Sequence, residues 1–172
     1  LSPKAALTPG GIAGRTDADC NRTQKIVAHF GGCQVTYALF IRRPVIAAHG
    51  LMVAWLENVA REQGFSVEIE TIYPEGSWVG AGEPLLYLTG PFTRMAPLET
   101  LLLQKLGSAC VAAHNAYQMA LALPDAAFMA MEARHCAGFE MQEMMGYAAS
   151  IGSRAARREG AKGFVGCAND VT

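Results

Sequence analysis

Residues 126–170 decide the fold class of this chain, and they read AAFMAMEARHCAGFEMQEMMGYAASIGSRAARREGAKGFVGCAND. The apolar run over 126–133 predicts a strand, and 138–158 has the length and composition of a long helix. A second short apolar run covers 164–166. A strand, a helix and a strand within about forty residues form the pattern of a βαβ unit. The stretch therefore predicts two parallel strands joined by a helix, and an α/β fold.

Polar side chains follow both of these strands at the point where each strand ends. Arg134 and His135 come after the first run, and Asn169 and Asp170 come after the second. Parallel strands end at the same edge of a sheet, which is where α/β proteins bind ligands. Cations at the start of a helix are unfavourable unless an anion offsets them, and arginine grips carboxylates and phosphates. The spacing leaves two interpretations open, an anion site or pairing with neighbouring glutamates.

The upstream sequence predicts alternating helices and strands. Residues 1–15 form a loose arm, 16–123 form an N-terminal α/β domain, and 124–172 form a second domain. Within the N-terminal domain we expect helices over 17–30, 45–63 and 98–122, the last interrupted or bent near Gly107, and strands over 34–40, 67–72 and 84–89. The expected core residues of the helix over 45–63 are Leu51, Val53, Trp55, Leu56 and Val59.

Composition excludes several classes of protein. Hydrophobic residues make up 51% of the chain and charged residues 17%, which is enough apolar material for a core. A net charge of −1 gives no reason to expect nucleic acid or an anionic membrane as a partner. The five cysteines are widely spaced, so we expect a reducing, cytoplasmic setting without disulfides or a zinc site. Because the chain begins at Leu1, we expect it to start inside a longer polypeptide or after processing.

Other charged and sulfur-bearing residues have less specific patterns. Arg42 and Arg43 follow a predicted strand, where they either receive an anion from a substrate or a neighbouring subunit or form a solvated pair. Three arginines at helical spacing suit the end of a helix and are interpreted as a solvated face: Arg154, Arg157 and Arg158. Five methionines are interpreted as core packing or a subunit seam: Met129, Met131, Met141, Met144 and Met145. His29, His49 and His114 are expected to be structural.

Several short motifs occur in an order that resembles a known family. The series consists of Thr16-Asp17 with Asn21-Arg22-Thr23, Gly82-Glu83-Pro84-Leu85-Leu86, Gly90-Pro91, Leu98-Glu99-Thr100-Leu101-Leu102, Ala133-Arg134-His135-Cys136-Ala137-Gly138, and Gly163-Phe164-Val165-Gly166-Cys167-Ala168-Asn169-Asp170. In this order the motifs resemble the nicotinate phosphoribosyltransferases, within the nicotinate/quinolinate phosphoribosyltransferase superfamily. The resemblance spans residues 16–172.

The resemblance implies a fold, an activity and partners. It implies an α/β sandwich domain over 16–123, followed from 124 by the first strands of an incomplete α/β barrel. It implies transfer of a phosphoribosyl group from phosphoribosyl pyrophosphate to nicotinate, giving nicotinate mononucleotide and pyrophosphate in NAD biosynthesis. Magnesium would travel with the pyrophosphate, and ATP is a further cosubstrate that the resemblance leaves open. The implied assembly is a homodimer or a higher homo-oligomer.

The resemblance also implies roles for individual residues. Arg134 and His135 would be catalytic and hold substrate, and Asn169 and Asp170 would line the same rim. Arg42 and Thr100 are further substrate-binding candidates. The similar quinolinate enzymes usually have arginine where this chain has Thr100. Quinolinate has a second carboxylate, which would be left unpaired without that cation, so Thr100 favours nicotinate and quinolinate stays the alternative.

Two departures from the family pattern lead to a further alternative. The family commonly has Tyr-Phe where this chain has Asp19-Cys20, and a carboxylate cannot stack on a pyridine ring. An eight-stranded barrel takes about 250 residues by itself, whereas only two such strands are expected here. We therefore expect a chain that stops before its active site is complete. The alternative from another class is a non-catalytic dimerisation or regulatory module.

Overall fold

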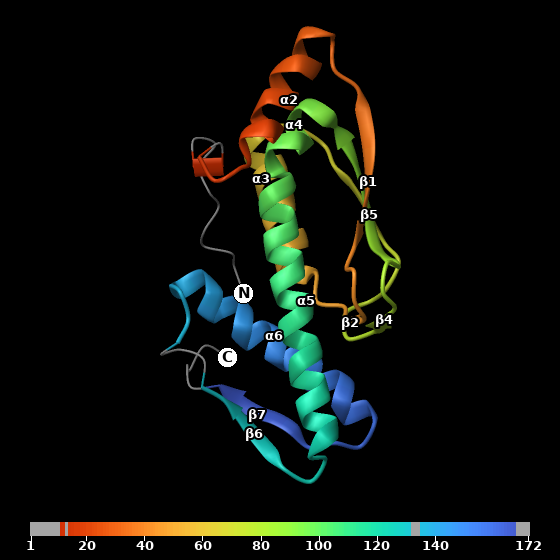
Figure 1. The fold of residues 1–172 in the computed structure, drawn as a ribbon, viewed down its shortest axis with the longest axis vertical. Helices are drawn as coiled ribbons and strands as arrows, with labels where there is room; N and C mark the ends of the chain where they lie inside the picture. The colour runs from red at the N-terminus through yellow and green to blue at the C-terminus, as the bar shows by residue number, and fades with distance from the viewer. Residues whose placement is uncertain (1–10, 13, 132–134, 168–172) are drawn as a thin grey trace. The chain divides into compact units, whose positions relative to one another are not determined.

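The computed structural model describes residues 11, 12, 14–131 and 135–167, and it shows a mixed α/β fold (Figure 1). The fold class predicted from the sequence is thereby confirmed. In chain order the elements are α2 (Ala18–His29), β1 (Gln34–Phe40), β2 (Val45–Ile46), α3 (Gly50–Gln63), β3 (Glu68–Thr71), β4 (Trp78–Val79), β5 (Pro84–Pro91), α4 (Phe92–Met95), the 3-10 helix η1 (Ala96–Leu98), α5 (Glu99–Ala122), β6 (Ala127–Ala130), α6 (Phe139–Arg158) and β7 (Gly163–Cys167).

The chain forms two compact units, and each contains segments that are separate in the sequence. Unit 1 comprises Leu1–Phe40, Gly50–Ile72 and Glu83–Leu106, and unit 2 comprises Ile41–His49, Tyr73–Gly82 and Gly107–Thr172. Helix α5 therefore contributes its beginning to unit 1 and the rest to unit 2. The domain boundary at residue 123 stays a prediction.

Unit 1 contains an antiparallel sheet in the order β1-β5-β3. Its central strand buries Leu85, Leu86 and Leu88 completely, each at 0% exposure. Tyr87 and Thr89 alternate with these residues and are only half-buried, as expected for a sheet with one face toward the core. The three strands expected over 34–40, 67–72 and 84–89 are confirmed.

Helix α2 in unit 1 confirms the helix expected over 17–30, and it ends before Gly31, which adopts a φ of 92°. That left-handed conformation favours glycine. The helix has no buried residue: Ile26 is 52% exposed, Val27 is half-buried, and Phe30, which follows the helix, is 80% exposed. Its contacts are with α4 and η1, the elements that lead into α5 (Figure 1).

The helix expected over 45–63 begins later than predicted, at Gly50. Val45 and Ile46 instead form β2, which pairs with Val79 and Trp78 of β4. β-Branched residues such as valine and isoleucine suit strands. The apolar run ends at Ala48, before His49 and Gly50. The strand itself is recognised by its partner, which lies more than thirty positions away in the sequence.

The buried face of α3 also differs in part from the prediction. Trp55, Leu56 and Val59 are buried as expected, whereas Leu51 and Val53 are half-buried. The remaining buried positions are Met52 and Ala60.

Helix α5 is continuous through Gly107, so the predicted interruption at this residue is wrong. Glycine inside a helix costs about 1 kcal/mol relative to alanine. Leu102, Leu106 and Cys110 on the same helix are fully buried. Such burial stabilises the helix by more than the glycine costs.

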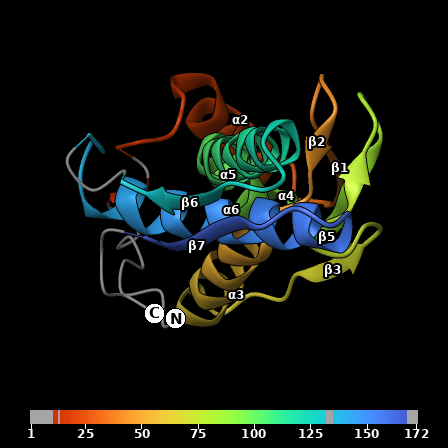
Figure 2. The same ribbon diagram turned by 90° about the horizontal axis from the view of Figure 1, so that it is seen from below.

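Unit 2 contains the predicted βαβ arrangement, because β6 and β7 pair in parallel and α6 joins them. Figure 2 shows the two strands running alongside α6. The helix buries a face of small residues that includes Gly152. A Cβ atom at Gly152 would lie 2.0 Å from the backbone oxygen of Ala113 in α5. Only glycine permits this close approach of α5 and α6.

Candidate functional site

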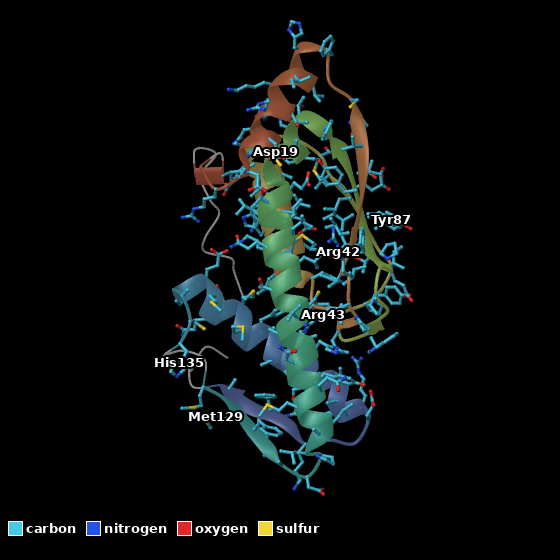
Figure 3. All side chains as sticks on the ribbon, viewed as in Figure 1. Asp19, Arg42, Arg43, Tyr87, Met129 and His135 are labelled. Atoms are coloured by element: carbon cyan, nitrogen blue, oxygen red, sulfur yellow. The ribbon has the colours of Figure 1, made fainter. Side chains whose placement is uncertain are left out.

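The carboxyl ends of β6 and β7 lie at one edge because the two strands are parallel. His135 follows β6 in the turn that precedes α6, where it is exposed to solvent (Figure 3). Arg134, Asn169 and Asp170 lie outside the described residues. Their roles at this edge stay predictions, and we refer to it below as the strand-end edge.

Helix α6 begins at the same edge, directly after Gly138. Gly138 has a φ of 94° and contributes no side-chain cap. The Ala137 amide donates a hydrogen bond to Sδ of Met141 at 3.4 Å, which holds the turn against the first turn of the helix. Helix N-termini favour anions, and the glycine at the N-cap position adds no side chain of its own there.

The other end of α6 holds the beginning of β7 through side-chain hydrogen bonds. Arg157 donates from Nε to the carbonyl oxygen of Lys162 at 2.9 Å and from Nη2 to that of Phe164 at 2.5 Å. Ser153 Oγ accepts from the Phe164 amide at 2.8 Å and lies 3.2 Å from the Phe164 carbonyl oxygen, to which it donates. Arg157 is exposed, as the interpretation of a solvated face expects, and its guanidinium also bonds two backbone carbonyls, which that interpretation did not include.

Thr100 lies in the first turn of α5, where its hydroxyl is engaged with the start of α2. Thr100 Oγ1 donates to Oδ2 of Asp17 at 3.0 Å and accepts from the Asp17 amide at 3.2 Å. Asp17 is the N-cap residue of α2, and its own side chain makes no capping hydrogen bond. Thr100 thus joins two helices of unit 1, and the substrate-binding role expected for it stays a prediction.

Carboxylates gather around this junction of α2 and α5. Burial raises the pKa of the Cys20 thiol, and the charges of Glu99 and Asp19 raise it further. Burial also raises the pKa of Tyr37 to about 12, with contributions from Glu99 and Cys20. A thiol with a raised pKa is a poor nucleophile. The junction is electronegative, which is unfavourable for a carboxylate ligand.

Arg42 and Arg43 are both exposed in the segment after β1 (Figure 3). Nη2 of Arg43 donates to Oδ1 of Asn115 at 3.4 Å. The pKa of His114 is lowered, first by burial and then by the positive charge of Arg43. The structure leaves both interpretations of the arginine pair open, an anion site or a solvated pair.

Unit 2 also contains buried polar contacts that the sequence did not reveal. Nε2 of His49 donates to the Tyr73 carbonyl oxygen at 2.9 Å, which fits the expected structural role of this histidine. Tyr147 of α6 donates its hydroxyl to Glu75, in the turn before β4. The Pro-Glu-Gly sequence of that turn signals the turn but not its partner.

The methionines near the strand-end edge are more exposed than core packing predicts. Met129, on β6, is labelled in Figure 3. Its side chain is 58% exposed, and those of Met131 and Met141 are 51% and 40% exposed. Core packing is therefore wrong for these three side chains, and the alternative of a subunit seam stays a prediction.

The described ranges contain no group of three histidine, cysteine, aspartate or glutamate side chains that could hold a metal ion. Within the same ranges no helix combines the length and apolarity that crossing a bilayer requires. The cysteines whose side chains are described, at positions 20, 33, 110 and 136, are free thiols.

Known structures share this fold over most of the chain. The nicotinate-nucleotide pyrophosphorylase from Pyrococcus furiosus is 22% identical, with a TM-score of 0.62 over 95% of this chain and 41% of its own. The human nicotinic acid phosphoribosyltransferase is 20% identical, with a TM-score of 0.64 over 90% of this chain and 36% of its own. The nicotinate-nucleotide pyrophosphorylase from Ehrlichia chaffeensis is 15% identical, with a TM-score of 0.60 over 90% of this chain and 54% of its own.

At these identities the likeness shows the fold. The chain spans between about a third and about half of the length of the proteins it matches. No protein-family model matches the sequence, and no curated protein matches it.

Proposed function

We propose that this protein transfers the phosphoribosyl group of phosphoribosyl pyrophosphate to nicotinate, giving nicotinate mononucleotide and pyrophosphate. The observation that carries the proposal is the fold. It is shared, over 90% or more of this chain, with proteins named as a nicotinate-nucleotide pyrophosphorylase and as a nicotinic acid phosphoribosyltransferase. The ordered motifs of the sequence support the same activity.

The chemistry of this reaction suits the groups at the strand-end edge. Pyrophosphate leaves as positive charge grows on the sugar, so the protein mainly orients the reactants and balances charge. Arg134 and His135 would hold the anionic groups of the substrates beside the N-terminus of α6. Asn169 and Asp170 would line the same rim. The N-cap glycine at position 138 places no side chain of its own at the helix end, which supports this arrangement.

Magnesium, when bound, would neutralise the pyrophosphate oxygens. The described residues offer no group of three acidic, histidine or cysteine side chains to hold it. Asp170 is the acidic side chain expected at the rim.

The junction of α2 and α5 supports nicotinate over quinolinate. Quinolinate carries one carboxylate more than nicotinate and needs a further cation. Thr100 provides none, and its hydroxyl is bonded to Asp17. Asp19 and Glu99 add negative charge nearby. These negative charges repel quinolinate, which has two carboxylates, more strongly than nicotinate, which has one.

The test uses the complete natural protein with isotope-labelled nicotinate, phosphoribosyl pyrophosphate and Mg²⁺, with quinolinate in a parallel reaction. We expect labelled nicotinate mononucleotide and an equal amount of pyrophosphate, with nicotinate preferred. Product from quinolinate alone would reassign the substrate. No product from either pyridine, with the protein folded, would leave the non-catalytic module as the better account.

A further inference from the structure

The beginning of β7 is held on two sides. Ser153 and Arg157 of α6 together bond the amide and the carbonyl of Phe164, and Arg157 also bonds the carbonyl of Lys162. The amide of Lys162 donates to the Pro124 carbonyl oxygen at 2.8 Å, in the segment that leads into β6. The start of β7 is thus tied both to the helix before it and to the segment before its partner strand.

The backbone at this point is shaped around Ser153. Gly163 has a φ of 67°, and a Cβ atom there would lie 2.5 Å from Oγ of Ser153. Any other residue at 163 would combine backbone strain with a clash. Gly163 stands opposite Ala127 of β6, and Phe164 stands opposite Phe128, with ring centroids 5.4 Å apart.

We propose that Ser153 and Arg157 are positioning residues for the strand-end edge. Their hydrogen bonds fix where β7 begins relative to β6. The strand covers Gly163–Cys167, so its start also sets where its carboxyl end reaches the edge. Asn169 and Asp170, the residues predicted to bind substrate at this edge, come two and three positions after the strand in the sequence, and through them the pair would act on substrate. The expected effect on kinetics rests on the proposed function, whereas the expected effect on the hydrogen bonds that hold β7 does not.

Arg157 is suited to this task because one guanidinium reaches two carbonyls at once. Its Nε atom bonds Lys162, directly before the strand, and its Nη2 atom bonds Phe164, on the strand, which sets an orientation as well as a distance. A lysine in its place carries the same charge but lacks the planar fork. Arg154 lies one turn away on the same helix and is exposed, so it provides a matched control.

The structural part is tested without any substrate, by amide hydrogen exchange in the complete protein. In Ser153→Ala the Phe164 amide loses its acceptor, and we expect it to exchange about tenfold faster. In Arg157→Ala we expect a smaller acceleration across the start of β7, and in Arg154→Ala none. Wild-type exchange at Phe164 in Ser153→Ala would overturn the proposal.

The kinetic part compares Arg157→Ala, Arg157→Lys and Arg154→Ala. A displacement of about 1 Å in groups that bind substrate can cost up to about a hundredfold. We expect KM for phosphoribosyl pyrophosphate to rise about tenfold in Arg157→Ala with kcat within about twofold, the signature of lost binding. Arg157→Lys should recover part of the loss, and Arg154→Ala should match the wild type.

The two parts separate the possible failures. If the wild-type protein transfers no phosphoribosyl group, the proposed function fails, and amide exchange alone decides whether the pair holds β7. If exchange accelerates in Ser153→Ala but KM stays at the wild-type value in Arg157→Ala, the pair only stabilises the fold and the positioning role is overturned.

Discussion

The sheets of unit 1 and unit 2 expose different kinds of residues to solvent. In unit 1 the antiparallel sheet exposes mainly polar residues, among them Thr36, Glu68 and Glu70, with Phe40 an apolar exception at 48%, while Leu85, Leu86 and Leu88 of its central strand are buried. In unit 2 the parallel pair exposes apolar side chains, with Met129 58% and Val165 62% exposed. Antiparallel sheets commonly have one polar face in water, whereas parallel strands are normally apolar on both faces because both are covered.

The two sheets differ in which of their faces are buried, and therefore in which side chains stabilise them. The sheet of unit 1 has a buried face and a mainly polar face, the usual arrangement for an antiparallel sheet that is covered on one side. The β6–β7 pair has the composition of strands covered on both faces, and α6 supplies contacts to only part of it. Substitutions in the buried strand of unit 1 should therefore cost much more than those on the exposed face of unit 2.

The largest effect is expected in the central strand of unit 1. Leu88→Ala removes a side chain with 0% exposure, and we expect a loss of about 2–5 kcal/mol in the free energy of unfolding. Met129→Ala on the exposed face of β6 should change it by less than about 0.5 kcal/mol. Urea denaturation measures both. Equal losses from the two variants would show that the exposed face of β6 is covered in the natural protein.

A smaller effect is expected where α5 and α6 pack in unit 2. In Gly152→Ala the new Cβ meets the Ala113 carbonyl, and the helices must separate, at a cost of about 1–3 kcal/mol. The matched control is Gly107→Ala in α5, where nothing lies within 4 Å of the added atom. That variant should gain about 0.5–1 kcal/mol. A loss in Gly107→Ala would contradict the continuous helix.

Two tyrosines, one in each unit, provide a comparison by pH. The pKa of Tyr37 is raised to about 12 chiefly by burial, and that of Tyr117 to about 12 chiefly by its hydrogen bond to the Glu159 carboxylate. In the unfolded chain tyrosine ionises near pH 10. Each tyrosine therefore contributes stability that is complete below about pH 10 and is lost as the pH rises toward about 12.

Ultraviolet titration of tyrosinate separates the two causes. Glu159→Gln removes the charge beside Tyr117, so the pKa of Tyr117 should fall while that of Tyr37 stays near 12. Tyr37→Phe and Tyr117→Phe assign the two transitions. A fall in both values in Glu159→Gln would contradict the separate causes.

The sequence predicted the helices and strands whose signals lie within the element itself. The strand over 34–40 and the helix before Gly31 were recognisable from composition and a terminating glycine. β2 and β4 were missed because two-residue strands are defined by their partners. The role of Arg157 was missed for a similar reason, since helical spacing places it toward solvent and only the path of β7 supplies its acceptors.

The candidate site was predictable only in part. The order of motifs and the parallel strands identified the strand-end edge, and the pairing of β6 with β7 confirms that both strands end there. The engagement of Thr100 with Asp17 could not be predicted, because the two residues are 83 positions apart in the sequence. The positions of Arg134, Asn169 and Asp170 stay predictions.

The most direct test of the central claim, that the strand-end edge binds the anionic substrates, is the turnover of Arg134→Ala measured beside that of Arg154→Ala in the complete protein. We expect Arg134→Ala to lose about a hundredfold in the rate of nicotinate mononucleotide formation, with an unchanged urea midpoint. Arg154→Ala should retain wild-type turnover. Wild-type turnover in Arg134→Ala would remove this arginine from the site and contradict the account.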